Sequence, residues 1–381
     1  MSKGNSASCR AAIPMPRSAG TTHDIILPRP LRVLLVEDSR VMREYLTHII
    51  STNPRLKIVA AVESGESALR VLREANPDVI SMDVRLPGLD GLETTRRIMA
   101  ERPTPIIVVA GNVESDDLKI SFNALRAGAL AVLEKPRGHI AKYYDSFAEK
   151  FCTQLVIMSQ VKVIKRRLHD LPARTRRPAH SAAAGAAQSA AYAMIGLVAS
   201  TGGPNALAEI LGALKQEMAA PIVIVQHITP CFSKAFTEWL GDVCELNVLE
   251  AGDGVCPAPG KVYVAPANRH LIAQNGRLWL SNEAPICQHR PSGDALFESL
   301  AREFGPRAIG VLLTGMGEDG ARGLRAMRDA GAHTIVEHES TAVVNGMPGA
   351  ALTIAAACEA LPLPEIAPRL RELMRRKHAR G

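Results

Sequence analysis

Three reactive side chains in the second half of the chain each follow a short apolar run. Ser200 follows "AMIGLVA", His227 follows "PIVIVQ", and Asp319 lies just beyond "AIGVLL". In an open parallel sheet, ligands bind beyond the carboxyl ends of the strands. A serine, a histidine and a carboxylate gathered there are the set needed for acyl transfer. They supply a nucleophile, a base, and a group that orients the base.

The turn "STGGP" after this strand is predicted to open a helix, whose first N–H groups can receive an oxyanion. Gly202 and Gly203 would let the backbone approach closely. The stretch "VASTG" lacks the G-x-S-x-G of the α/β-hydrolase elbow, and it also lacks the G-x-G-x-x-G of a dinucleotide site. Taken singly, His227 could be a structural histidine and Asp319 an ordinary turn acid. The spacing favours an enzyme and leaves a binding turn open.

A second group of polar residues follows the strands predicted in the first half of the chain. Glu37 and Asp38 follow "LRVLLV", Asp83 ends "DVISMD", and Lys135 follows "ALAVLE". Crowded carboxylates repel one another unless a cation joins them, and hard oxygen ligands suit Mg²⁺. A carboxylate can also act as a nucleophile and form an acyl phosphate, with the lysine neutralising the phosphoryl oxygens. One such pair could be scattered surface acids, but several strand ends together favour a phosphoryl-accepting site.

The elements that position these residues follow one pattern twice. Short apolar runs alternate with amphipathic stretches from Leu31 to about residue 140, and again from Tyr192 to about residue 375. Strands that are apolar throughout are buried on both faces, so the sheets should be parallel with helices on each side. The predicted fold class is therefore α/β, with two doubly wound parallel-sheet domains. A chain of 381 residues is long enough for both.

The composition sets the expected boundaries. Residues 1–29 are rich in small and polar residues and predict a disordered extension, residues 30–150 a first domain, and residues 192–376 a second. Residues 151–191 include "PARTRRPAHSAAAGAAQSAA", which lacks periodic apolar residues and predicts a linker.

The charge and cysteine content exclude several classes of protein. The net charge of +7 is concentrated in the linker and the C-terminal "RLRELMRRKHARG", without interleaved aromatic residues, so no nucleic-acid partner is expected. The seven cysteines include no CxxC pair, which argues against a zinc site or a disulfide framework and suits a reducing cytoplasm. No apolar run reaches the roughly 18 residues that span a bilayer, so no membrane insertion is expected. The N-terminus has no signal-peptide apolar region.

Residues from about 31 to 140 resemble the receiver domain of two-component response regulators. The motifs that carry the resemblance are "VLLVEDS", "SMDVRLPGLDG" and "VLEKP". The resemblance implies a flavodoxin-like fold, phosphorylation of Asp83 and a phosphoryl contact from Lys135. It also implies Mg²⁺ bound by Glu37, Asp38, Asp83 and the backbone of Arg85.

Two positions depart from the receiver pattern. Ala110 stands where receivers usually carry serine or threonine, and Val132 stands where many carry an aromatic residue. Both positions belong to the switching apparatus, so the acceptor chemistry is expected to remain while the strength of switching is open.

The second half of the chain resembles the catalytic domain of chemotaxis protein-glutamate methylesterases, a Rossmann-like three-layer domain. The shared motifs are "ASTGGP", "VIVQHI", "GKVYVAPANRHL", "HRPSGDALF", "GVLLTGMGEDGARGL" and "VVNGMPGAA". Receiver, linker and esterase in this order is the architecture of that family. The resemblance implies a triad of Ser200, His227 and Asp319, with no cofactor in this domain. It also implies an oxyanion hole from the backbone N–H of Met316, with Thr201 as a second contributor.

The expected function is that of a monomeric, phosphorylation-regulated serine hydrolase of the cytoplasm. It would demethylate glutamate γ-methyl esters on chemoreceptors, deamidate receptor glutamines, and receive its phosphoryl group from a chemotaxis histidine kinase. Arg269, His270 and Arg290 are candidates to line the substrate cleft, with surface or turn roles as the alternative. The family's "QDE" tripeptide reads "VEHE" here, which leaves substrate contacts there open. Two rivals remain: an esterase of the same fold with a different protein target, and a non-catalytic interaction module.

Overall fold

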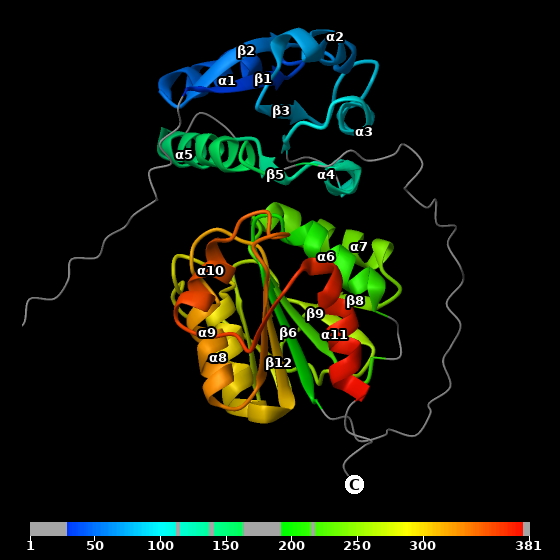
Figure 1. Ribbon diagram of the computed structural model, residues 1–381, viewed down its shortest axis with the longest axis vertical. Helices are drawn as coiled ribbons and strands as arrows, with labels where there is room; N and C mark the ends of the chain where they lie inside the picture. The colour runs from blue at the N-terminus through cyan, green and yellow to red at the C-terminus, as the bar shows by residue number, and fades with distance from the viewer. Residues whose placement is uncertain are drawn as a thin grey trace, which may run out of the picture.

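The computed structural model of the chain describes residues 29–111, 115–136, 141–161, 163, 192–214 and 218–375. The predicted N-terminal extension, except its last residue, and most of the predicted linker lie outside the described residues. The described residues form two α/β domains, one above the other in Figure 1. None of the helices in this part of the chain combines the length and apolar character that a membrane-spanning helix requires.

The first domain contains a five-stranded, fully parallel sheet with the strand order β2-β1-β3-β4-β5. This is the flavodoxin-like order, so the predicted fold is confirmed. The strands are β1 (Leu31–Val36), β2 (Leu56–Val62), β3 (Val79–Asp83), β4 (Ile106–Ala110) and β5 (Ala131–Glu134). The helices are α1 (Arg40–Thr52), α2 (Gly65–Ala75), α3 (Gly91–Glu101), α4 (Ser115–Ala127) and α5 (Ala141–Met158).

Polar caps set where the first three helices begin. Ser39, Ser64 and Asp90 each accept a hydrogen bond from the backbone N–H three residues later, which satisfies one of the unpaired donors of the first turn. The central strands β3 and β4 are buried at every position. Loops of two to seven residues separate the ends of β1, β2 and β3 from these helices, and the polar strand-end residues lie at the rim of the sheet.

Helix α5 continues past residue 150, where the sequence predicted the start of the linker. Phe151, Leu155 and Val156 are buried in the core of the first domain together with residues of α1 and β1. Their apolar character was visible in "FCTQLVIM", but the boundary depends on which surface covers them. We therefore propose that the first domain extends to Met158 and that the linker begins after it.

The second domain contains a seven-stranded, fully parallel sheet with the order β14-β13-β12-β6-β7-β9-β8. Successive residues of β6 enter clusters on opposite faces: Ile195 and Leu197 join one, and Met194 and Val198 the other. The strands are β6 (Met194–Ala199), β7 (Ile222–Gln226), β8 (Asn247–Glu250), β9 (Lys261–Val264), β12 (Ala308–Leu312), β13 (His333–Glu337) and β14 (Glu359–Leu361). The helices are α6 (Gly203–Ala213), α7 (Pro230–Val243), α8 (Gly293–Phe304), α9 (Ala321–Asp329), α10 (Gly346–Thr353) and α11 (Leu363–Arg375), with a 3₁₀ turn at Gly305–Arg307.

An antiparallel hairpin departs from the parallel pattern. Strands β10 (His270–Gln274) and β11 (Arg277–Ser281) pair in register from Gln274 opposite Arg277. Asn275 and Gly276 form the turn with φ of 52° and 69°, as a two-residue hairpin turn requires. The sequence reading included the second strand but missed the first, although the Asn-Gly pair is a hairpin signal.

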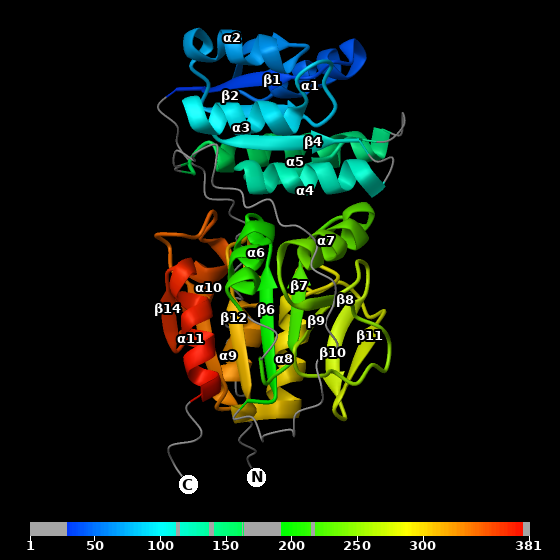
Figure 2. The ribbon, with the colours of Figure 1, turned by 90° about the vertical axis from the view of Figure 1, so that its right-hand side faces the viewer.

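The two domains pack through α4 of the first domain against α6 and α7 of the second, and Figure 2 shows α4 lying over these two helices. Side-chain contacts from β5 and α5 add to the interface: Cys231 Sγ donates to Glu134 Oε2, and Gln154 Nε2 donates to Thr201 Oγ1. Phe122 of α4 meets an aromatic cluster on α7, with its ring 5.9 Å from Phe232 and 5.4 Å from Trp239. All three side chains are nearly fully buried. The contact between α4 and α7 is therefore apolar, and it lies beside the strand ends of the second sheet.

Candidate active site

The predicted nucleophile, base and orienting acid lie at the carboxyl ends of adjacent strands. In the order β12-β6-β7, Ser200 follows β6, His227 follows β7, and Asp319 lies in the loop after β12. The backbone N–H of Ser200 donates to Thr314 O at 3.0 Å, and that of His227 donates to Ala199 O at 3.0 Å. These hydrogen bonds continue the parallel ladders beyond the strand ends, so both side chains are held at the same edge of the sheet.

His227 and Asp319 form a close pair. Nε2 of His227 lies 2.8 Å from Oδ2 of Asp319, and both side chains are buried. Asp319 also accepts hydrogen bonds from Ser292 Oγ at 2.6 Å and Gly293 N–H at 2.6 Å. Burial alone would raise the pKa of Asp319, but these donors and His227 lower it to about 2. The carboxylate is therefore ionised and held in place before any substrate arrives.

The pairing determines which nitrogen of His227 can act as a base. Because Nε2 faces a carboxylate, it carries the proton, and Nδ1 keeps the free lone pair. Nδ1 is buried and has no hydrogen-bond partner. The structure therefore joins His227 to Asp319 and does not hydrogen-bond His227 to Ser200. Catalytic contacts often tighten only when substrate binds.

The ring of His227 is also held by a second histidine. The His289 ring stacks on it with centroids 3.9 Å apart and an interplanar angle of 4°. Burial and the neighbouring His227 lower the pKa of His289 to about 4, so His289 is neutral near pH 7. The two rings therefore pack without a charge on His289, and the stack restricts the plane of His227.

Backbone N–H groups near Ser200 are available for an oxyanion. A side chain at Gly315 would come 2.7 Å from Ser200 Cβ, so the loop after β12 passes directly beside the serine. Met316 follows in that loop and is 39% exposed. Neither Met316 N–H nor Thr201 N–H donates a hydrogen bond among the described residues. Gly202 is the N-cap of helix α6 and has a φ of 81°. A residue with a side chain would be strained in this conformation.

Sequence reasoning missed the residues that hold the acid. Ser292 is the N-cap of α8, and its hydroxyl both accepts from Ala295 N–H and donates to Asp319. The N-terminus of a helix favours a carboxylate because its N–H groups are unpaired. The signal was present in "HRPSGDALF", where a serine precedes a helix, but it does not say which acid the helix faces.

The three candidates for the substrate cleft have structural partners instead. His270 is buried, accepts from Ser292 N–H and bonds Ala284 O. Arg269 donates to Leu280 O, and Arg290 donates to Asn282 O and Glu283 O. These contacts support the alternative of turn and structural roles.

The acceptor residues of the first domain lie together at the edge of its sheet. Lys135 Nζ lies 2.8 Å from both Glu37 Oε2 and Asp83 Oδ2. Ligand atoms of Glu37, Asp38 and Asp83 lie within 4.8 Å of one another. Arg85 N–H donates to Asp83 Oδ1 at 3.4 Å.

The electrostatics of this cluster fit a divalent cation. Burial raises the pKa of Glu37 to about 7, with the charge of Asp83 adding to the effect and Lys135 opposing it. Burial likewise raises the pKa of Asp83, again against Lys135. Lys135 thus does not fully offset the burial and mutual repulsion of these carboxylates. An all-oxygen donor set with excess negative charge fits Mg²⁺.

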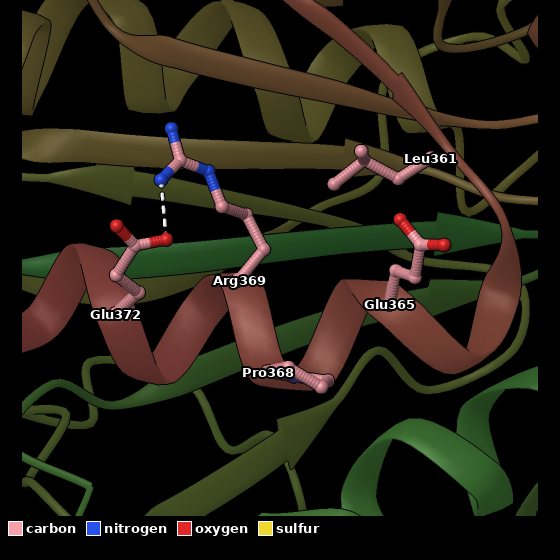
Figure 3. A pocket seen from close by; sticks show the side chains of 5 residues that line it. All are labelled: Leu361, Glu365, Pro368, Arg369 and Glu372. Carbon is pink, nitrogen blue, oxygen red and sulfur yellow. Dashed lines mark hydrogen bonds and ion pairs between the residues drawn. The ribbon is translucent and has the colours of Figure 1, made fainter.

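A shallow hollow elsewhere on the second domain does not belong to the site. It comes from α11 and the edge strand β14, and Arg369 within it pairs with Glu372 at 2.7 Å, as Figure 3 shows. Arg369 also bonds Glu359. None of its lining residues comes from the three strands that carry Ser200, His227 and Asp319.

Comparison with known proteins gives matches along both domains. The family model for the response regulator receiver domain matches residues 33–142, and that for CheB methylesterase matches residues 195–370. A protein-glutamate methylesterase/protein-glutamine glutaminase of Paramagnetospirillum magneticum is 49% identical and covers 91% of this chain and 98% of its own. One from Syntrophus aciditrophicus is 43% identical, covering 88% and 96%. The crystal structure of the Thermotoga maritima CheB methylesterase catalytic domain is 38% identical, covers 48% of this chain and 98% of its own, and has a TM-score of 0.46.

Proposed function

The chain belongs to the family of protein-glutamate methylesterases/protein-glutamine glutaminases, and we propose that Ser200, His227 and Asp319 carry out its hydrolysis. The protein is a phosphorylation-regulated hydrolase that removes the methyl group from glutamate γ-methyl esters of chemoreceptors and deamidates receptor glutamines. The observation that carries the residue assignment is the buried His227–Asp319 pair at the sheet edge from which Ser200 projects.

The proposed reaction uses the free lone pair of His227. Nδ1 takes the proton of Ser200 Oγ as Oγ bonds to the ester carbonyl carbon, and the carbonyl oxygen becomes an oxyanion. The N–H groups of Met316 and Thr201 stabilise that charge. Methanol then leaves with the proton from His227, or ammonia leaves when the substrate is glutamine. Water, deprotonated by His227, attacks the acyl-enzyme, and glutamate and Ser200 are restored.

The first domain supplies the control. Asp83 accepts the phosphoryl group from a chemotaxis histidine kinase, and Lys135 contacts its oxygens. Mg²⁺ bound by Glu37, Asp38, Asp83 and the backbone of Arg85 would neutralise the charge that gathers during the transfer. We place the enzyme in the cytoplasm as a monomer, because its substrate groups lie on cytoplasmic helices of the receptors and one chain supplies both sites.

The packing of the receiver domain supports inhibition of the hydrolase by a receiver that covers the active site. Gln154 of α5 donates to Thr201 Oγ1 at 3.4 Å, one residue from the nucleophile, and Asn205 of α6 donates to Ala129 O at 3.3 Å. A methylated receptor helix needs an open approach to Ser200. A receiver resting on this edge obstructs that approach, and phosphorylation can shift the balance between covered and open forms.

Removal of residues 1–190 is therefore expected to raise basal methanol release above that of the unphosphorylated full chain. Phe122→Ala offers a matched point variant, because it removes one ring from the aromatic contact and leaves both domains present. It should raise basal activity in the same direction. If neither protein is faster than the parent, the receiver domain does not inhibit by covering the active site, and phosphorylation activates through another contact.

Ala110 is expected to weaken the phosphorylation switch. Ala110 is the last residue of β4 and is buried. It has no hydroxyl that could donate a hydrogen bond to a phosphoryl oxygen on Asp83. A hydrogen bond to a charged group is worth roughly 1.5–3 kcal/mol. About 1.4 kcal/mol is one decade in a population ratio, so Ala110→Ser and Ala110→Thr should increase the ratio of phosphorylated to unphosphorylated activity by about tenfold or more. Phosphorylation of Asp83 in Mg²⁺ should persist in the parent. An unchanged ratio in both variants would show that the switch does not depend on this hydroxyl.

The function is tested with receptor membranes carrying labelled methyl esters. Release of methanol supports the proposed reaction. Hydrolysis of unrelated esters alone would favour an esterase with another protein target, and tight binding without hydrolysis would favour an interaction module.

A further inference from the structure

A buried carboxylate lies two strands away from the nucleophile, with β12 between them. Glu337 is the last residue of β13, which pairs with β12, and it is only 1% exposed. Ile335, two residues earlier, points into the cluster that α6 and α11 cover, so Glu337 lies on the same face of the sheet. No step of the proposed reaction uses it.

Glu337 is connected to Ser200 through a single residue, Thr314. The backbone N–H of Thr314 donates to Glu337 Oε2 at 2.9 Å. The carbonyl of Thr314 accepts the N–H of Ser200 at 3.0 Å, and its hydroxyl donates to Thr201 O at 2.9 Å. Thr314 also begins the loop that leads to Met316. The carboxyl group of Glu337 thus anchors the residue that joins the nucleophile to the proposed oxyanion loop.

The surroundings of Glu337 stabilise an ionised carboxylate poorly. Oε1 is buried without a hydrogen-bond partner. Burial raises the pKa of Glu337 to about 6, and the charge of Glu209 on α6 adds to this, while Thr314 and Thr341 oppose it. The Thr341 hydroxyl also donates to His338 O at 3.3 Å, so its stabilisation of the Glu337 carboxylate is only partial.

Other charged groups near β13 are engaged elsewhere. Glu359 of β14 bonds Arg369 of α11. On α9, Arg325 pairs with Asp329 and Arg328 donates to Ala357 O. Strand β12 and helix α10 contain no titratable side chains. Glu209 is therefore the charge that acts on Glu337 from a neighbouring element.

We propose that Glu337 is a positioning residue for the Ser200 loop, and that gain or loss of its carboxyl proton tunes the rate of ester hydrolysis in mildly acidic solution. The inference rests on Ser200 being the nucleophile. In either protonation state a carboxyl oxygen can accept from Thr314 N–H, so the loop remains anchored. The ionised form adds a buried negative charge that is linked through Thr314 to the loop where the oxyanion develops, and this charge opposes the transition state.

The test compares Glu337→Gln, Glu337→Ala and the exposed control Glu339→Gln in the full chain, with methanol release measured from pH 5 to 8. Glutamine keeps an acceptor for Thr314 N–H but does not titrate. We expect Glu337→Ala to lower kcat by on the order of tenfold, because it leaves a buried donor unpaired. Glu337→Gln should restore kcat to the parent level or above, with little change in KM.

The ratio of the Glu337→Gln rate to the parent rate is the decisive readout. All other groups are the same in the two proteins, so their effects on the rate cancel in the ratio. The ratio should rise by about threefold or more as the pH passes through 6, whereas the ratio for Glu339→Gln should stay flat. A flat ratio for Glu337→Gln, or full activity of Glu337→Ala, would overturn the inference. Neither result would affect the assignment of Ser200, which depends on its own variant.

A stability measurement checks the titration independently of catalysis. The pKa of Glu337 in the folded chain, about 6, lies above its ordinary value of 4.5, so its ionisation opposes folding above pH 6 and has no effect below 4.5. Glu337→Gln should therefore raise the melting temperature at pH 8 and leave it unchanged near pH 4.5. An equal shift at both pH values would show that Glu337 does not titrate as proposed.

Discussion

Replacing Ser200 with alanine is expected to lower methanol release by about 10⁴-fold or more. The variant loses the only atom that bonds to the ester carbonyl carbon in the proposed reaction. The turn itself should persist, because it depends on backbone contacts: Ser200 N–H donates to Thr314 O, and Gly203 N–H donates to Ser200 O at 2.9 Å. The measurement is the initial rate of methanol release from methyl-labelled receptor membranes.

Folding and phosphorylation provide the controls for Ser200→Ala. Its melting temperature should match that of the parent, and Asp83 should still accept a phosphoryl group, because the acceptor cluster lies in the other domain. A rate within tenfold of the parent would show that Ser200 is not the nucleophile.

Asp319→Asn is expected to lower turnover by on the order of 10⁴ near neutral pH. Asp319 accepts from His227, Ser292 and Gly293, and an amide can accept through only one of its two end atoms. The amide nitrogen would face a donor, so His227 would lose its partner or adopt the other tautomer. Methanol release and a melting curve should be measured together, because the same change also removes contacts at the start of α8.

Two other carboxylates of the second domain could be considered as the orienting acid, Asp253 and Asp294, but both have other roles in the structure. Asp253 accepts from Leu280 N–H at 2.8 Å, and Asp294 accepts from Gly323 N–H at 2.8 Å. Asp253→Asn is therefore a suitable control and should retain activity. Near-normal turnover by a folded Asp319→Asn protein would mean that the orienting acid lies elsewhere.

The pH dependence of the pair follows from the low pKa of Asp319. Since that pKa is lowered to about 2 from 3.8, the stabilisation it gives is present above pH 3.8 and is lost as the pH falls through 2. Asp319 thus stays ionised throughout any assay above pH 4, and any change of rate with pH in that range belongs to other groups.

The strand ends were predictable because one physical rule places them. Apolar runs buried on both faces require a parallel sheet, and a parallel sheet brings Ser200, His227 and Asp319 to one edge. The same rule placed Asp83 beside Lys135. Both doubly wound sheets were therefore predicted from the apolar pattern and confirmed in the structure.

The contacts that tune these sites were not predictable from the chain alone. Stacking of His289 on His227 depends on a turn that folds back from beyond the hairpin, and hydrogen bonding of Ser292 to Asp319 depends on where α8 points. In the sequence, Glu337 is only an acidic residue at the end of a predicted strand. The packing of α6 and β12 around it shows that it is buried. Phe122 likewise reads as a core residue, and its partners on α7 come from the other domain.

The most direct test of the account is methanol release from methyl-labelled receptor membranes, before and after a small-molecule phosphodonor and Mg²⁺ are added. The parent should release methanol, and phosphorylation should increase the rate. Asp83→Asn should retain the basal rate without the increase, and Ser200→Ala should release none above background in either state. No release by the parent, or equal release by Ser200→Ala, would contradict the proposal that Ser200 carries out ester hydrolysis under the control of Asp83.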